Sequence, residues 1–197
     1  MSSEIFHITN SSSHSALLAD LHIKSLPLSF ISSLGLQFTS YFYAQHLSNN
    51  SSILSILYLH GYPSAFLLSS CKFKPLSLVI LSFLARHPVN IFSFIYSLFN
   101  YFFCLVSKLR FSLASHSSKY NIPSYSRVLL SFCVTPSYQS LGFGTKLFQA
   151  HLNYLRSISE KSLYIRTSIL QPKAVSFYSK YSKPFQINQN VYFSISL

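Results

Sequence analysis

Acidic residues are scarce in this chain. Only 3 Asp and Glu stand against 15 Lys and Arg in 197 residues, which gives a formal net charge of +12 at pH 7. A positive field of this size attracts phosphates, nucleic acid and anionic membrane surfaces, but it does not indicate a fold. Gly and Trp are also rare and Ser is abundant along the whole chain. We therefore interpret part of the charge as a compositional bias.

Cysteines are too few for a disulfide scaffold. Cys71, Cys104 and Cys133 are odd in number, widely spaced and set in apolar runs, which is typical of reduced, buried thiols. This pattern favours a cytoplasmic protein and predicts no metal site. Cys133 has two interpretations, a buried strand residue or a nucleophile, and the absence of a neighbouring His favours the first.

The N-terminus lacks a basic start followed by a long apolar run, so it does not read as a signal peptide. Residues 1–14 are short, Ser-rich and predicted to be a disordered tail. The hydrophobic fraction of 49% allows one sizeable core, and the length fits one domain over residues 15–197.

The first half of the domain is predicted to contain two helices and a hairpin. Apolar residues recur at helical spacing in Ser15–Leu26 and again in Leu34–Leu47. Two short apolar runs follow, Ile53–Leu59 and Ala65–Ser70, separated by the turn-forming stretch His60–Pro63. We expect these runs to form an antiparallel pair.

Residues 71–126 are interpreted as a helical insertion. Within them Val89–Val106 carries no charge and is flanked by basic residues, so a membrane span is one interpretation. A helix of this length covers only about 27 Å, and its polar residues fall on one stripe. An amphipathic helix packed on the domain, or lying on a membrane surface, is favoured over a span.

The C-terminal part alternates strands and helices. The predicted strands are Val128–Val134, Leu163–Ile169 and Val191–Leu197, and the predicted helices run from Gly144 to Arg156 and from Pro172 to Tyr181. This order indicates an α/β arrangement on a mixed sheet.

A glycine-containing turn, Pro136–Gly144, joins the first of these strands to the following helix. Unpaired N–H groups and the helix dipole favour an anion at such a helix start. A Gly-x-Gly turn can also be a tight turn without a ligand, and this interpretation stays open on the turn alone.

Two stretches together are similar to the GNAT superfamily of N-acetyltransferases. Gln139–Gly144 matches its acetyl-CoA motif, which has Gln or Arg, two variable positions, Gly, a variable position, and Gly or Ala. Ala174–Tyr178 matches its second motif, at the expected spacing and on the expected helix. The resemblance implies a mixed, mostly antiparallel sheet, splayed at the cofactor cleft and flanked by helices, with residues 127–182 as the acetyl-CoA-binding core.

The resemblance also implies site residues. Tyr178 would be the catalytic acid for the departing CoA thiolate, and its alternative is a packed aromatic. A backbone N–H near Val134 would stabilise the oxyanion. The implied acetyl-CoA-binding residues are Phe132, Cys133, Val134, Gln139, Ser140, Leu141, Gly142, Phe143, Gly144 and Gln171. The implied reaction moves an acetyl group from acetyl-CoA, as co-substrate and without a metal, to a primary amine of an acceptor.

Several positions depart from the family pattern. The family commonly has Gly at Ser140, a basic residue at Leu141 and Asn at Gln171, and many members have an acid at the position of Val128. These departures favour the alternative of a degenerate, GNAT-like protein that binds CoA or keeps the fold without turnover.

Other candidates are weaker. Asp20 and His22, on the first predicted helix, could approach an acceptor, although a capping or surface role is favoured for each, and Glu160 is expected to be solvated. Nucleic-acid binding is disfavoured, because the aromatic residues follow core periodicity and are not interleaved with Lys and Arg.

Overall fold

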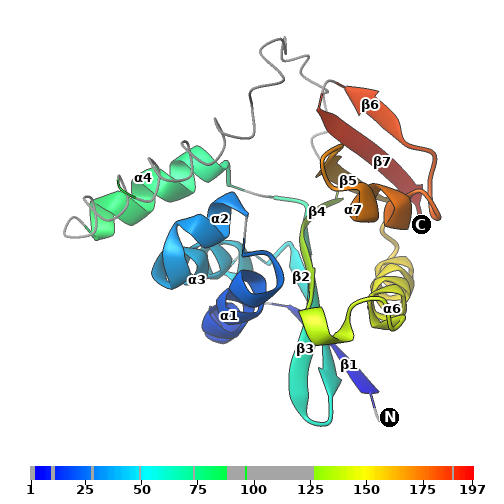
Figure 1. Cartoon of the computed structure of the whole chain (residues 1–197), viewed down its shortest axis with the longest axis horizontal. Helices are drawn as coiled ribbons and strands as arrows, with labels where there is room; N and C mark the ends of the chain where they lie inside the picture. The colour runs from blue at the N-terminus through cyan, green and yellow to red at the C-terminus, as the bar shows by residue number, and fades with distance from the viewer. Residues whose placement is uncertain are drawn as a thin grey trace.

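The computed structural model describes residues 3–9, 12–27, 29–48, 50–72, 74–87, 96, 127–187 and 189–197. It contains a seven-stranded sheet with helices on both sides (Figure 1). Only Tyr96 of the predicted Val89–Val106 helix belongs to this set, so that prediction lies outside the described residues.

The elements alternate along the chain as an α/β protein requires. In chain order they are β1 (Ser3–Thr9), α1 (Ser15–Ser25), α2 (Phe30–Ser33), α3 (Gly35–Leu47), β2 (Ser52–Leu59), β3 (Tyr62–Ser70), α4 (Leu76–Arg86), β4 (Arg127–Val134), α6 (Phe143–Ser157), β5 (Ser162–Ser168), α7 (Pro172–Tyr178), β6 (Phe185–Ile187) and β7 (Asn190–Ser196). Single 3-10 turns lie at Ser12–His14 and Pro136–Tyr138. The predicted helices and strands of both halves are confirmed, with shifts of a few residues at their ends, whereas α2, α4 and β6 had not been predicted as separate elements.

The described residues among the first fourteen do not form the predicted disordered tail. Ser3–Thr9 is strand β1, which pairs with β2 in antiparallel register from Ser3 opposite Leu59 to Thr9 opposite Ile53. The prediction was wrong because this strand lies at the sheet edge and is only half buried. Its side chains therefore alternate too weakly in polarity for the sequence to show a strand.

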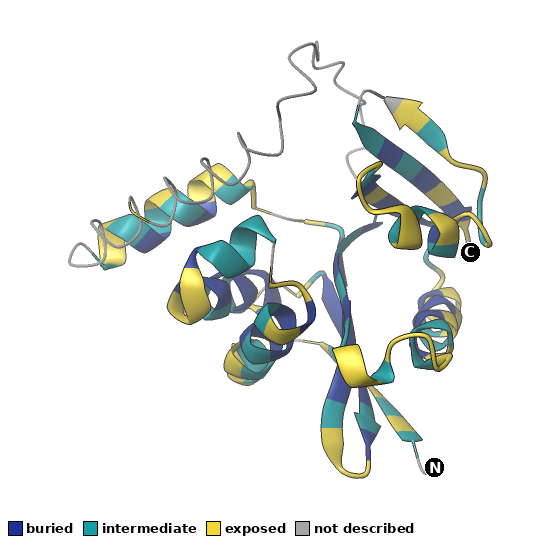
Figure 2. Cartoon of the chain, viewed as in Figure 1, coloured by how far each residue is buried: buried dark blue, intermediate teal, exposed yellow. Residues whose placement is uncertain are grey.

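The sheet runs in the order β1-β2-β3-β4-β5-β7-β6, and among the described strands only β4 and β5 pair in parallel. Helices α1, α2 and α3 cover one face of its first four strands, and α6 covers the other (Figure 1). Alternate residues of the central strands enter two separate cores, so Leu54 and Ile56 pack toward α1 and α3 while Ile53 and Leu57 pack toward α6. Burial on both faces explains the continuous apolar runs in the sequence (Figure 2).

The sheet opens between β4 and β5. These strands pair only at Arg127 with Leu163 and at Val128 with Tyr164, although β4 continues to Val134, where it still pairs with Ala65 of β3. Strand β5 instead stays paired with β7 along its length. The result is a V-shaped separation of the two half-sheets, as the predicted splay requires.

Candidate functional site

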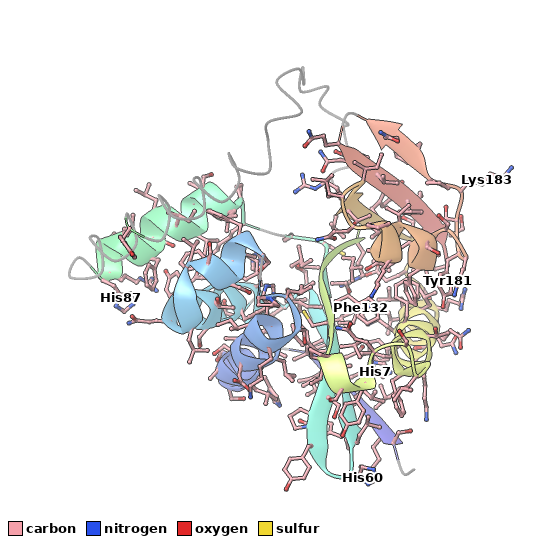
Figure 3. The ribbon with its side chains drawn as sticks, viewed as in Figure 1. His7, His60, His87, Phe132, Tyr181 and Lys183 are labelled. Carbon is pink, nitrogen blue, oxygen red and sulfur yellow. The ribbon has the colours of Figure 1, made fainter. Side chains whose placement is uncertain are left out.

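A cavity of about 770 Å³ adjoins the open side of β4. This volume is typical of a small-molecule site. Its lining comes from β4, from the turn that follows, and from α6 and α7, and consists of Phe132, Val134, Gln139, Ser140, Gly142, Gly144, Thr145, Pro172, Lys173, Ser176, Phe177 and Lys180. The first six were predicted to bind the cofactor. Figure 3 places Phe132 on β4, at the centre of the molecule.

Short hydrogen bonds fix the turn between β4 and α6. The N–H of Thr135 donates to the carbonyl of Ser64 at 2.9 Å, and the side-chain Nε2 of Gln139 donates to the carbonyl of Val134 at 2.9 Å. Ser140 and Gly142 both adopt left-handed backbone conformations, with φ of 64° and 84°. Gly adopts this conformation without strain, whereas Ser does so at a cost.

Helix α6 presents its N-terminal end to the cavity. Its first hydrogen bond runs from the N–H of Lys146 to the carbonyl of Gly142, at 3.0 Å, so the N–H groups of residues 143–145 precede the intrahelical ladder. A Cβ on Gly144 would lie 3.4 Å from Val134 and 3.5 Å from Phe132. These are ordinary van der Waals distances. The helix thus begins beside the strand, where its dipole favours an anion.

Helix α7 and the residues directly after it supply positive charge to the cavity. Lys173 and Lys180 line the cavity, and none of the described residues that line it is acidic. Two cations beside a helix N-terminus create a local field that favours a phosphorylated ligand.

A motif match and structural similarity both relate this site to known proteins. The sequence profile of the acetyltransferase (GNAT) family matches residues 109–182, which include the turn, α6 and α7. A search of curated proteins finds no match to the sequence. The structure is similar to that of the PaiA N-acetyltransferase from Thermoplasma acidophilum in complex with coenzyme A, with a TM-score of 0.60, 10% identity and 100% of both chains covered.

The chain has the GNAT acetyltransferase fold. An acetyltransferase from Thermus thermophilus is similar over 100% of this chain and 98% of its own, with a TM-score of 0.59 and 11% identity. The ribosomal-protein-S18-alanine N-acetyltransferase from Escherichia coli is similar over 98% of this chain and 94% of its own, with a TM-score of 0.53 and 10% identity. The predicted resemblance and fold class are thereby confirmed.

The other predicted cofactor residues do not line the cavity. Leu141 is exposed and Phe143 packs against the ring of Tyr138. Gln171 precedes α7 and accepts a hydrogen bond from Thr167 at 2.9 Å. The Cys133 side chain is buried among the residues of the α1 and α3 core. Backbone contacts of these four residues with a cofactor stay a prediction.

Tyr178, predicted as the catalytic acid, is buried among aromatic rings. Its ring lies 5.7 Å from Phe148, 5.3 Å from Phe177 and 5.6 Å from Phe193, measured between centroids. Burial raises the pKa of its hydroxyl far above the ordinary value. The raised pKa keeps the hydroxyl protonated at neutral pH but also makes it a weaker proton donor. Phe177, rather than Tyr178, lines the cavity, and the catalytic role stays a prediction.

A buried polar cluster lies on the face of β4 that is turned away from the cavity. The sequence analysis did not predict that its residues meet. His22 Nδ1 lies 2.5 Å from the Tyr43 hydroxyl, and that hydroxyl lies 2.9 Å from Ser131 Oγ. Cys133 Sγ lies 3.9 Å from His22 Nδ1. Burial raises the pKa of Cys133 to about 12, which favours a neutral buried thiol over a nucleophile. These residues are far apart along the chain, so spacing gives no signal that they meet.

Glu160 is not simply solvated, as the sequence had suggested. Its carboxylate oxygen Oε1 accepts hydrogen bonds from Nε and Nη2 of Arg127, at 2.9 and 2.5 Å. Arg127 begins β4, at the closed end of the V. Residue 160 lies too far from residue 127 in sequence for this pair to have been read from the pattern.

Proposed function

We propose that the protein transfers an acetyl group from acetyl-CoA to a primary amine of an acceptor. The observation that carries the proposal is the opening of β4 away from β5 beside a basic cavity at the start of α6. A pyrophosphate suits this helix end, and the amides of a pantetheine arm suit a strand edge left without a partner strand.

The residues present fit this co-substrate. Gly142 and Gly144 allow close approach of a ligand to the backbone, Lys173 and Lys180 offset phosphate charge, and Phe132 and Val134 offer apolar contact along the arm. A backbone N–H near Val134 would stabilise the oxyanion, and Tyr178 would protonate the leaving thiolate. The cofactor-bound neighbour and the family match support acetyl transfer. The acceptor is proposed only by its chemical class.

A second candidate is a GNAT-like protein that binds CoA without turnover. Ser140 holds a left-handed conformation that the family's Gly would adopt without strain. Position 128 on β4 is Val, where many family members have an acid, and position 141 in the turn is Leu, where the family commonly has a basic residue.

Titration with acetyl-CoA while following thermal unfolding tests both candidates. A ligand at a hundredfold over its Kd adds about 2.7 kcal/mol to the free energy of unfolding. Release of CoA thiol on adding alkylamines, aminoglycosides or peptide α-amines supports transfer. Binding without release supports the second candidate, and absence of binding contradicts both.

We also propose a cytoplasmic protein that makes at most peripheral contact with membranes. Within the part of the chain that the structure describes, no helix is long and apolar enough to cross a membrane. Cell fractionation tests the proposal, because resistance to alkaline carbonate extraction would indicate a spanning segment.

A further inference from the structure

The proposed amine transfer needs an acceptor for the proton that the amine loses, and none of the chain's three side-chain carboxylates is placed for this role. Glu4 is exposed on β1, which β2 and β3 separate from β4. Asp20 forms an exposed ion pair with Lys24, and Glu160 is paired with Arg127. The proton must therefore leave through other groups.

A continuous hydrogen-bonded chain leads from β4 to the surface. It begins at Ser131, passes through Tyr43 and His22, and continues from His22 Nε2 to Ser29 Oγ at 2.9 Å. Ser29 Oγ then donates to Ser32 Oγ at 2.8 Å. Ser32 Oγ in turn donates to the carbonyl of Leu26, at 2.7 Å and in an exposed position.

The hydrogen bonds that Ser29 and Ser32 donate determine the donor and the acceptor in every other hydrogen bond of this series. Because the proton of Ser29 goes to Ser32, Ser29 must accept the proton carried by His22 Nε2. His22 Nδ1 is then an acceptor, so it receives the hydroxyl proton of Tyr43. Tyr43 in turn accepts from Ser131. Every hydroxyl thus points its proton away from β4.

The inner end of this chain lies at the open edge of the sheet. Ser131 belongs to the part of β4 that has lost its pairing with β5. It precedes Phe132, which lines the cavity, but its own side chain lies on the other face of the strand, toward Tyr43 of α3. It keeps 9% of its surface exposed.

We propose that Ser131, Tyr43 and His22 form a relay that takes the proton of the acceptor amine at β4 and delivers it to the surface through Ser29 and Ser32. The inference rests on the proposed transfer. Ser131 is its catalytic residue, and Tyr43 and His22 act through it.

Protons balance along the relay. As the amine nitrogen bonds to the acetyl carbon, its N–H bond breaks and Ser131 Oγ gains the proton. Ser131 passes its own proton to Tyr43, Tyr43 passes one to His22 Nδ1, and the Nε2 proton moves on to Ser29. One proton enters and one leaves at Ser32. The imidazole is left as the Nδ1–H tautomer, so a ring flip of His22 and rotation of the hydroxyls must restore the starting arrangement before the next turnover. Burial lowers the pKa of His22 to about 4, so the ring passes the proton on and does not store it.

Tyr43→Phe tests the relay, because it keeps the ring and removes the hydroxyl in the middle of the chain. We expect kcat for the best amine of the panel to fall about a hundredfold or more at pH 7, with the Kd for acetyl-CoA unchanged. The loss should shrink toward pH 9, where hydroxide can take the proton directly. His22→Gln should behave in the same way. Among the described residues, the titratable groups facing His22 are Tyr43 on α3 and Cys133 on β4.

Ser55→Ala is the matched control on the other face of the sheet. Its buried hydroxyl lies 2.7 Å from His7 Nδ1 and 2.6 Å from His151 Nδ1, so its removal also takes one hydrogen-bond partner from the half-buried His7 and one from the buried His151. We expect this variant to lose stability while keeping the kcat and pH profile of the unmodified protein. If Tyr43→Phe fails to fold, Ser131→Ala removes the entry hydroxyl and is measured in its place.

Two results would overturn the relay alone: a Tyr43→Phe protein with unchanged kcat and pH profile, or a Ser55→Ala protein that loses as much turnover. An unmodified protein that binds acetyl-CoA but transfers nothing to any amine would overturn the proposed function, and the relay with it.

Discussion

Arg127 and Glu160 form an ion pair at the point where β4 and β5 are still joined. Nε and Nη2 of Arg127 donate to the same carboxylate oxygen, at 2.9 and 2.5 Å, and Nη1 donates to the carbonyl of Ser51 at 2.9 Å. The Arg127 side chain is 5% exposed and that of Glu160 is 23% exposed. This pair links the start of β4 to the turn before β5, so it closes the narrow end of the V.

Glu160→Gln should therefore destabilise the protein. The substitution leaves the buried guanidinium without a counter-charge, which costs about 3 kcal/mol, measured as a loss in the free energy of unfolding in urea. Asp20→Asn is the control, because the Asp20–Lys24 pair is 50% and 62% exposed and exposed pairs contribute under about 1 kcal/mol. Equal losses from both variants would contradict the structural role of the buried pair.

Gly142→Glu should abolish acetyl-CoA binding. Gly142 lines the cavity at the start of α6, and a carboxylate there would repel the pyrophosphate. Because φ is 84° at this position, any side chain also introduces strain. Gly142→Gln carries the same strain and a similar size without the charge, so it should bind more tightly than the Glu variant in calorimetric titrations. Unchanged affinity in a folded Gly142→Glu protein would rule out this site.

Ser140→Gly should stabilise the protein by about 1 kcal/mol, because it relieves a left-handed conformation. Ser159 also has a positive φ, of 61°, beyond the far end of α6, so Ser159→Gly should give a similar gain in urea unfolding. Only Ser140 lines the cavity, and only its substitution should tighten acetyl-CoA binding. A loss of stability at position 140 would show that the serine side chain contributes more than the strain costs.

Tyr178→Phe should lower turnover about a hundredfold or more if the hydroxyl protonates the CoA thiolate. The ring and its packing against Phe148 and Phe193 are kept, so stability and the Kd for acetyl-CoA should not change. Tyr181→Phe removes a hydroxyl from the same aromatic cluster and should leave turnover intact. A fully active Tyr178→Phe protein would make Tyr178 a packing residue.

Stability should fall as the solution is acidified below neutrality. Burial lowers the pKa of His22 and His46 to about 4 and that of His151 to about 3, against about 6.5 in an unfolded chain. The unfolded state therefore binds more protons. The stability contribution is complete above about pH 6.5 and is lost as the pH falls through about 4.

Urea midpoints between about pH 7 and about pH 4.5 measure this loss. His151→Gln should make the midpoint less dependent on pH. His60→Asn, at the exposed turn between β2 and β3, should not. A midpoint that stays constant over this range would contradict the neutral burial of the three histidines.

The strands and helices that hold the site could be predicted because their pattern of apolar residues matches the faces that are buried in the fold. Strand β4 is apolar because both of its faces are covered, and α6 carries Leu147, Phe148, Leu152 and Leu155 on one buried side. Gly142 marks the left-handed residue that begins α6. Position 140 was read as a departure from the family, and its left-handed φ shows why glycine suits that place.

The parts that the sequence did not predict depend on distant partners. Strand β1 is defined by its pairing with β2, a strand that lies far along the chain. The buried polar cluster around His22 and the Arg127–Glu160 pair likewise join segments that only the fold brings together. Polar residues in such clusters do not recur at regular spacing in the sequence. A prediction from neighbouring residues alone therefore places them at the surface.

The brief contact between β4 and β5 also bears on how the molecule responds to temperature. Within the described residues, two register pairs join the half-sheets, and residues of α6 and of strands in both half-sheets belong to one apolar core. Side-chain packing and the Arg127–Glu160 pair thus close this seam, whereas backbone ladders hold each half-sheet together. Apolar association weakens on cooling. The seam, and not either half-sheet, is therefore where cold should first loosen the protein.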